Sequence, residues 1–310
     1  MIIIPNMARR SVAVCALAPL VLLVACGRPA DTALPRGKCP AKPVRITVSV
    51  DQWTDLARTL AGDCAKVETV VKSTSIDPHE YEPTPADTAQ LTNADLALVN
   101  GLGYDAWASK AVAAASPRPN LVNAATAAGF SSGDNPHVWY DPAALPKVAT
   151  ATTATLTKML PKAATYLQEQ SAVWAKQQVP YRSAVDRVAM VAKGRPYAAT
   201  DPVAAHLARA VGLKDLTPAG FAQAAANDSE PTPGDYAQLL DEVTMKKIDV
   251  LVVNGQHRGN LTGRVVAAAK AAHVPVVTVT ETVPPGTKGF VEWQVQQLNR
   301  LFTALKGSSS

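Results

Sequence analysis

Along the chain, short apolar runs alternate with longer segments whose apolar residues recur at helical spacing. Val44 to Val50 alternates in polarity and is rich in β-branched side chains, which is typical of a strand. Trp53 to Ala61 has apolar residues at helical spacing, and Gly62 ends it. Similar patterns predict strands at 67–71, 96–100 and 121–123, and helices at 86–92 and 104–115. Strands that alternate with helices indicate a parallel sheet with helices on both faces.

The segment from Asp141 to about Lys193 is helical in pattern almost without a pause. Pro161 is placed to begin a second helix, and Pro180 must kink or split it. The second half repeats the first, with strands predicted at 195–200, 249–253 and 274–280, and helices at 202–211, 233–246, 262–272 and 290–305. The predicted fold is α/β, with two lobes, each a mostly parallel sheet flanked by helices, joined by a long rigid connecting helix. The predicted boundaries are 43–160 for the N-terminal lobe, 161–193 for the connecting helix, 194–305 for the C-terminal lobe and 306–310 for a tail.

The first 25 residues are predicted to be an export signal. Arg9 and Arg10 precede an apolar run that ends in small residues before Cys26, and this run is shorter than a membrane span and contains Pro19. A buried N-terminal helix is the alternative. The ending Leu23-Val24-Ala25-Cys26 resembles the bacterial lipoprotein box, which implies that Cys26 carries the lipid. Residues 26–42 then form a lipidated tether.

Composition narrows the class of protein. The chain is 47% hydrophobic and 18% charged, which suits a soluble globular protein and argues against disorder. The formal charge is +5, and removal of Arg9 and Arg10 with the signal leaves only +3, with no basic run suited to nucleic acid. After the signal and Cys26, the remaining cysteines are Cys39 and Cys64, which we predict to form a disulfide in an exported protein.

Two similar motifs carry the candidate chemistry. Asp77-Pro78-His79-Glu80-Tyr81-Glu82-Pro83 and Asn135-Pro136-His137-Val138-Trp139-Tyr140-Asp141-Pro142 each present a histidine just after a proline of fixed φ. Open α/β sheets bind ligands at the carboxyl ends of their strands. The loops predicted there also carry Asp201 and Glu281 in the second half. Two imidazoles and two carboxylates from four separate loops make a suitable first shell for a divalent metal ion.

Other roles remain open for several of these residues. Asp201 could instead cap the helix that begins at Pro202, and Glu281 could pair with a lysine or arginine at the lobe edge. His206 could be a pocket residue or simply a packed histidine. Apart from the four proposed ligands, His257 is the better candidate for a further site residue, because it lies on a loop at the end of a strand. Tyr81, Glu82 and Trp139 are predicted to line the pocket and orient the imidazoles.

Taken together, the two histidine motifs, Thr200-Asp201-Pro202-Val203 and Val279-Thr280-Glu281-Thr282-Val283-Pro284 resemble the TroA/ZnuA-like metal-binding lipoproteins of ABC transporters. The resemblance covers roughly residues 43–305. It implies that His79 and His137 are ligands. Asp201 stands where many zinc members have His and many manganese members Glu, and Glu281 stands where Asp is usual. His206 occupies a place that is usually aromatic.

The sequence therefore predicts a monomeric lipoprotein on the outer face of the cytoplasmic membrane, not an enzyme. The resemblance implies that it captures a divalent metal ion between its lobes and passes it to an ABC permease. Zinc is favoured over manganese, because imidazole suits zinc and neither carboxylate need bind through both oxygens. The alternatives are a secreted zinc-dependent hydrolase, a binding protein for an organic chelate such as a siderophore, and a structural lipoprotein with relic ligands.

Overall fold

In the computed structural model, the described residues are Met1, 37–72, 81–227, 229–257 and 259–307. Residues 34–310 form one compact unit. The proposed signal and Cys26 lie outside the described residues, as does the loop that carries His79. None of the helices in the described ranges combines the length and apolar character that crossing a membrane requires.

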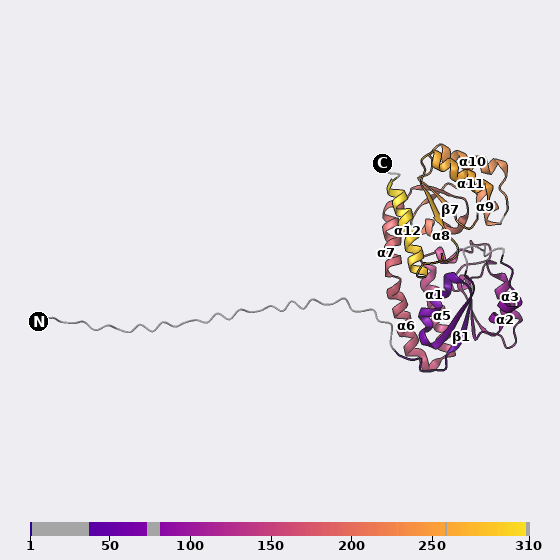
Figure 1. Cartoon of the computed structure of the whole chain (residues 1–310), viewed down its shortest axis with the longest axis vertical. Helices are drawn as coiled ribbons and strands as arrows, with labels where there is room; N and C mark the ends of the chain where they lie inside the picture. The colour runs from indigo at the N-terminus through magenta and orange to yellow at the C-terminus, as the bar shows by residue number, and fades with distance from the viewer. Residues whose placement is uncertain (2–36, 73–80, 228, 258, 308–310) are drawn as a thin grey trace. The chain divides into compact units, whose positions relative to one another are not determined.

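Two parallel sheets organise the unit (Figure 1). The first has the strand order β2-β1-β3-β4 and the second has β6-β5-β7-β8. The chain therefore uses the same order twice, as the repeated sequence pattern suggests. The strands are β1 Val44–Val50, β2 Ala65–Val71, β3 Leu96–Val99, β4 Asn120–Asn123, β5 Pro196–Ala199, β6 Lys214–Asp215, β7 Val250–Asn254 and β8 Val276–Val279.

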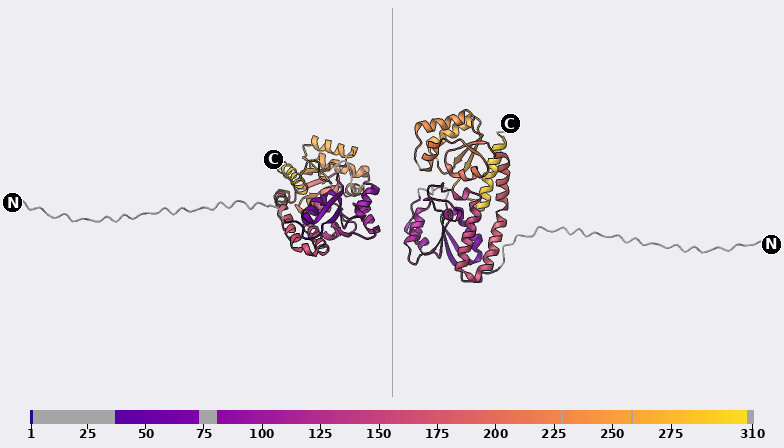
Figure 2. Two further views of the ribbon diagram at one scale, coloured as in Figure 1. Left: turned by 60° about the horizontal axis from the view of Figure 1, so that its bottom comes forward. Right: turned by 180° about the vertical axis from the view of Figure 1, so that it is seen from behind.

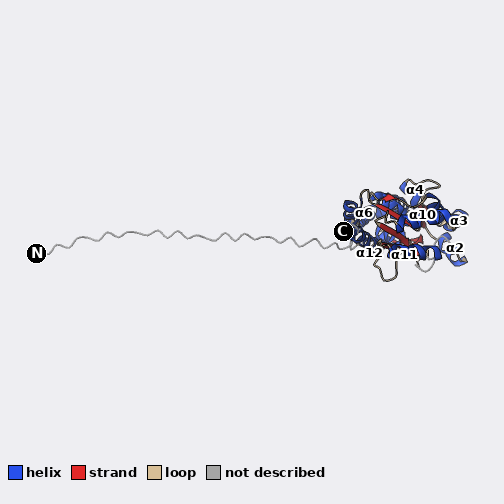
Figure 3. Ribbon diagram, turned by 90° about the horizontal axis from the view of Figure 1, so that it is seen from above, coloured by secondary structure: helices blue, strands red, loops and turns tan. Residues whose placement is uncertain are grey.

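Helices flank both sheets (Figure 3). We call the part from β1 to α5 the N-lobe and the part from β5 to α12 the C-lobe. The N-lobe helices are α1 Thr54–Ala61, α2 Pro85–Thr92, α3 Ala106–Ala114, α4 Ala124–Ala128 and α5 Ala144–Met159. The C-lobe helices are α8 Ala205–Ala210, α9 Ala219–Ala226, α10 Pro233–Thr244, α11 Asn260–Ala271 and α12 Phe290–Gly307.

The connecting helix consists of α6 Ala164–Gln177 and α7 Val179–Ala192, which are separated at Gln178. Pro180 stands at the start of α7, where its missing N–H costs least, so it divides the helix in the predicted way. Helix α12 of the C-lobe lies alongside α7 (Figures 1 and 2). The two-lobed α/β fold with a connecting helix is confirmed.

The central strands form the core of each lobe because helices cover them on both faces. All of β3 and β7 is buried, which explains their near-continuous apolar sequences, and the last five residues of β1 are buried although Thr47 and Ser49 are polar. Helix α2 begins where Thr84 accepts the N–H of Asp87, whose carboxylate accepts the N–H of Thr84 in return. Cys39 and Cys64 form a disulfide that fixes the start of the N-lobe beside β2.

The structure differs from the predicted elements near Tyr104. The predicted helix 104–115 begins only at Ala106, because the buried carboxylate of Asp105 accepts the backbone N–H groups of Asn100 at 2.6 Å and Gly101 at 2.9 Å. Burial raises the pKa of Asp105, and these hydrogen bonds oppose that rise. A Cβ atom at Gly101, where φ is +89°, would lie 2.3 Å from Asn123 Oδ1, so only glycine fits this loop.

Candidate metal centre

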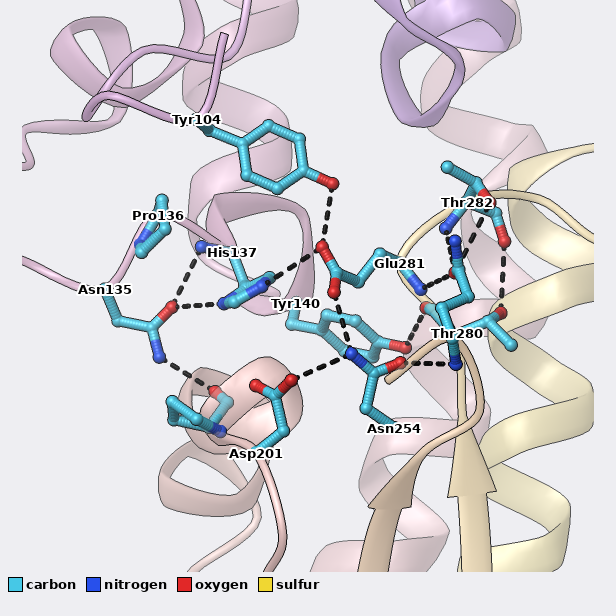
Figure 4. A network of polar contacts seen from close by, with 12 residues as sticks. Tyr104, Asn135, Pro136, His137, Tyr140, Asp201, Asn254, Thr280, Glu281 and Thr282 are labelled. Atoms are coloured by element: carbon cyan, nitrogen blue, oxygen red, sulfur yellow. Dashed lines mark hydrogen bonds and ion pairs between the residues drawn. The ribbon is translucent and has the colours of Figure 1, made fainter. Parts of the chain in front are cut away.

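In each sheet, the chain first adds a strand on one side of the starting strand and then continues on the other side. The direction of strand addition therefore switches between β1 and β3 in one sheet and between β5 and β7 in the other. The loops that leave two such strands separate, and this opens a crevice at the carboxyl ends. Gln52 follows β1 and Tyr104 follows β3, while Asp201 follows β5 and Asn254 ends β7. The two crevices face each other, because all four side chains join the Glu281 loop in one polar network. Figure 4 shows Tyr104, Asp201 and Asn254 in this network.

His137 is held in one orientation by Asn135. Its Nδ1 lies 2.7 Å from Asn135 Oδ1, and its backbone N–H donates to the same oxygen at 2.9 Å. Because Asn135 Nδ2 donates to Pro202 O at 2.8 Å, the oxygen of this amide must be the atom that faces the imidazole. Nδ1 therefore donates to Asn135, and Nε2 faces Glu281 Oε2, 3.4 Å away.

Glu281 is only 1% exposed, and both of its carboxylate oxygens accept hydrogen bonds. The Tyr104 hydroxyl donates to Oε2 at 2.9 Å, and Asn254 Nδ2 donates to Oε1 at 2.8 Å. Gln256 Oε1 fixes the backbone by accepting the N–H of Glu281 at 2.6 Å. In the described contacts, the Glu281 carboxylate is therefore bonded to Tyr104 and Asn254 and faces His137.

Asp201 joins the network through Asn254, whose Nδ2 also donates to Asp201 Oδ2 at 2.8 Å. Its carboxylate does not cap the following helix. Burial is the main cause that raises the pKa of Asp201, and the charge of Glu281 adds to it, whereas His137 and Asn254 lower it. One amide thus bridges two carboxylates that repel each other. A divalent cation between them would remove the repulsion.

The Glu281 loop belongs to the C-lobe by sequence, yet it is bonded to the N-lobe on both sides of Glu281. Gln52 Nε2 donates to Glu281 O at 2.7 Å, and the Tyr140 hydroxyl donates to Thr280 O at 2.8 Å. Two N-lobe carboxylates also accept backbone N–H groups beyond it. Asp51 accepts from Val283 at 3.2 Å and Asp55 from Phe290 at 2.6 Å. Together with Tyr104, five N-lobe side chains hold this loop.

The predicted pocket residues take different positions. Trp139 is fully buried, and its ring meets His137 edge-on with the centroids 5.3 Å apart. The Tyr81 hydroxyl donates to Asp87 Oδ2 at 2.7 Å, which fixes the start of α2, and Glu82 is exposed. No contact of Tyr81 or Glu82 with His137, Asp201 or Glu281 occurs among the described residues.

His206 is buried and binds the second histidine motif from outside. Its Nε2 lies 2.9 Å from Asn135 O, and its Nδ1 lies 3.0 Å from an Arg209 nitrogen. Burial is the main cause that lowers its pKa, and Arg209 lowers it further. A neutral imidazole that donates through Nε2 and accepts through Nδ1 satisfies both contacts. His206 thus helps to position Asn135, while His257 is exposed.

Sequence reasoning did not identify Gln52 or Tyr104. The available signal was position, since each follows a central strand at its carboxyl end. His79 lies outside the described residues, and within them no three His, Cys, Asp or Glu side chains form a group suited to a metal ion. The described part of the centre is therefore His137 facing Glu281, with Asp201 attached through Asn254.

Solved structures share this fold. The periplasmic zinc-binding protein TroA from Treponema pallidum superposes with a TM-score of 0.72 at 19% sequence identity. The match covers 86% of this chain and 99% of TroA. At that identity the likeness establishes the fold alone.

Two curated relatives match by sequence. The iron-binding protein YfeA of Yersinia pestis is 31% identical over 109 residues. The match covers 33% of this chain and 35% of YfeA, so the chain spans only about a third of that relative. The manganese-binding lipoprotein MntA of Bacillus subtilis is 24% identical over 249 residues, or 76% of this chain and 78% of MntA. The names of these relatives and of TroA thus refer to three different metals, iron, manganese and zinc.

The family model for the periplasmic component A of the zinc-uptake complex, ZnuA, matches residues 46–304. This range runs from β1 into α12 and contains both histidine motifs, Asp201 and Glu281. The resemblance inferred from the motifs is confirmed, and the chain belongs to the ZnuA family of periplasmic metal-uptake components.

Proposed function

We propose that this protein is an extracytoplasmic solute-binding lipoprotein that captures a divalent metal ion between its lobes and delivers it to an ABC importer. Zinc is the preferred ion. The observation that carries the proposal is the approach of His137 Nε2 to Glu281 Oε2, 3.4 Å apart and buried between the lobes. Two donors that each lie about 2.1 Å from a tetrahedral ion are about 3.4 Å apart, so one zinc ion would fit both without rearrangement.

The proposed ligands are His79, His137, Asp201 and Glu281. His137 would bind through Nε2, because its Nδ1 is engaged by Asn135. The two ionised carboxylates would balance the charge of the ion. Tyr104 and Asn254 hold opposite oxygens of Glu281, which favours coordination through one oxygen and hence a small four-ligand site. Manganese, which prefers a larger oxygen-rich shell, is the second candidate.

This site also argues against the other functions considered. The side chains of His137 and Glu281 are 5% and 1% exposed, which leaves them poorly accessible to an organic chelate such as a siderophore. Four protein ligands would fill a tetrahedral zinc shell and leave no open position for the water of a hydrolase. Membership of a metal-uptake family supports a transport role in place of catalysis.

Release of the ion is proposed to begin at Asp201. Five N-lobe side chains hold the Glu281 loop, whereas the hydrogen bonds described between the Asp201 segment and the N-lobe all involve Asn135. Asn135 donates to Pro202 O at 2.8 Å, and its carbonyl lies 2.9 Å from His206 Nε2. When the permease separates the lobes, these two contacts break first. Asp201 then leaves the ion while Glu281 stays with the N-lobe.

The proposed setting follows from the N-terminal sequence. We assign residues 1–25 to a signal peptide and residues 26–42 to a lipidated tether that keeps a monomeric protein on the outer face of the membrane. Residues 43–160, 161–193 and 194–305 are assigned to the N-lobe, the connecting helix and the C-lobe, and 306–310 to a tail. The names of several curated relatives describe lipoproteins, which supports this assignment.

A metal-competition experiment tests the proposal. The purified protein, stripped of metal, is offered equimolar zinc, manganese and iron(II), then freed of unbound ions and analysed by mass spectrometry of the elements. We expect about one zinc ion per chain. Retention of manganese or iron would refute the preference for zinc but not metal capture. If no metal is retained, the proposed function is wrong.

Replacing Tyr104 by phenylalanine is expected to weaken zinc binding by about tenfold or more, because a residue that orients a ligand carboxylate is lost. Competition with a zinc chelator measures the change. Tyr236→Phe is the matched control, since its hydroxyl has no hydrogen-bond partner among the described residues. Equal zinc affinity in the Tyr104→Phe variant and the wild type would show that Tyr104 does not position Glu281.

A further inference from the structure

A basic hollow lies at the amino ends of the N-lobe strands, opposite the metal centre. It lies where β1, β3 and β4 begin, so it is separated from the ligand loops by the length of the strands. The hollow has a volume of about 750 Å³ and is lined by the cations Lys42, Arg45 and Arg118 and one carboxylate, Asp95. Because the hollow and the metal centre lie at opposite ends of the strands, both could be occupied together.

The charges in the hollow do not cancel. Asp95 lies 3.5 Å from Arg45, and both side chains are well exposed. Lys42 and Arg118 are exposed too and form no ion pair with any residue that the structure describes. Arg118 is oriented by a hydrogen bond of 2.8 Å to Ala113 O. Two cations are thus left without a counter-charge.

Apolar groups also border the hollow. Met159 lines it, and the exposed Lys158 and Lys162 are near Met159 in the sequence. Pro43 and Pro117 add exposed apolar surface at its rim. Cations mixed with apolar groups are typical of surfaces that lie in the headgroup region of a membrane.

The chain enters the folded unit beside this hollow. The disulfide between Cys39 and Cys64 fixes the entry point, and Lys42 lies three residues later. Only 12 residues lie between Cys26 and Cys39, so an acylated Cys26 would keep the hollow within about 45 Å of the bilayer. The intervening sequence adds Arg28, Arg36 and Lys38 against one acid, Asp31.

We propose that the hollow formed by Lys42, Arg45 and Arg118 binds the phosphates of anionic phospholipids and holds the N-lobe against the membrane. Ammonium and guanidinium groups near an anionic bilayer each strengthen binding, and a basic surface is the usual second signal beside a lipid chain. The biological setting rests on the proposed lipidation of Cys26. The binding itself depends on neither lipidation nor metal.

Flotation with lipid vesicles tests this inference on the unlipidated chain that begins at Gly27, which retains the compact unit of residues 34–310. Vesicles contain phosphatidylcholine alone or phosphatidylcholine with phosphatidylglycerol. We expect binding only to the anionic vesicles, with a loss at high salt. Lys42→Gln/Arg118→Gln should weaken that binding by at least about fivefold.

The matched control is Arg264→Gln/Lys270→Gln, which removes two exposed cations from α11 of the C-lobe. It should bind anionic vesicles as the wild type does. Equal losses in both variants would show an effect of net charge alone, and no loss in the Lys42/Arg118 variant would show that the hollow takes no part. Either outcome overturns the inference. Zinc retention in the same variants confirms that they are folded and tests the proposed function separately.

Discussion

The His79→Ala/His137→Ala variant is expected to purify without metal, whereas the wild type retains close to one ion per chain. His137 is positioned by Asn135 so that its Nε2 faces Glu281 Oε2. Loss of both imidazoles would leave only carboxylates that repel each other. Mutating a residue that only orients a ligand typically lowers metal affinity by roughly 10–100-fold. The loss of zinc affinity in this variant should be larger, because it removes two ligands.

The chain supplies a matched control for this variant. His273 is exposed, and it has a positive φ of 58°, which asparagine tolerates well. The His273→Asn form therefore removes an imidazole outside the proposed site with little strain. Its metal content should equal that of the wild type. Unchanged metal content in the His79/His137 variant, or loss in the control instead, would contradict the proposed site.

The Cys39→Ser/Cys64→Ser variant is expected to lose about 3 kcal/mol of unfolding free energy, because the disulfide closes a loop across a separation of 25 residues. Urea denaturation of the chain that begins at Gly27 measures this change. Zinc affinity should be retained, since the disulfide lies where β2 begins and the ligand loops lie at the other edge of the sheet.

A reductant provides the control for the disulfide prediction. It should lower the stability of the wild type to that of the variant and leave the variant unchanged. If the variant and the wild type unfold at the same urea concentration without reductant, the disulfide does not stabilise the N-lobe. If the variant loses zinc while it remains folded, the metal centre is not independent of the disulfide at the opposite end of the strands.

The strands with continuous apolar sequence and the connecting helix were predictable, because burial on both faces and helical spacing are local signals. Ala219–Ala226 and the two-residue strand Lys214–Asp215 were not predicted. The first is rich in alanine with a single fully buried residue, Phe221, so it shows little amphipathic periodicity. The second is too short to form a pattern, and it exists because it pairs with β5.

The candidate ligands were predictable because each follows a strand or repeats a motif, and Asp201 and Glu281 were selected on that ground. The roles of Gln52 and Tyr104 were not, because they depend on the order in which strands lie in the sheet. Only the pairing of β1 with β3 places Gln52 Nε2 within 3.1 Å of the Tyr104 hydroxyl and both against Glu281. Periodicity along the chain carries no information about that order.

The fastening of the Glu281 loop to the N-lobe has a kinetic consequence. If Glu281 moves with the lobe that carries His137, the residence time of the ion depends on how fast Asp201 departs, and therefore on the two contacts of Asn135. Differences among related binding sites are usually expressed in dissociation rates. Asn135 is thus a position at which the speed of unloading can change while the Glu281 loop and its five N-lobe partners stay as they are.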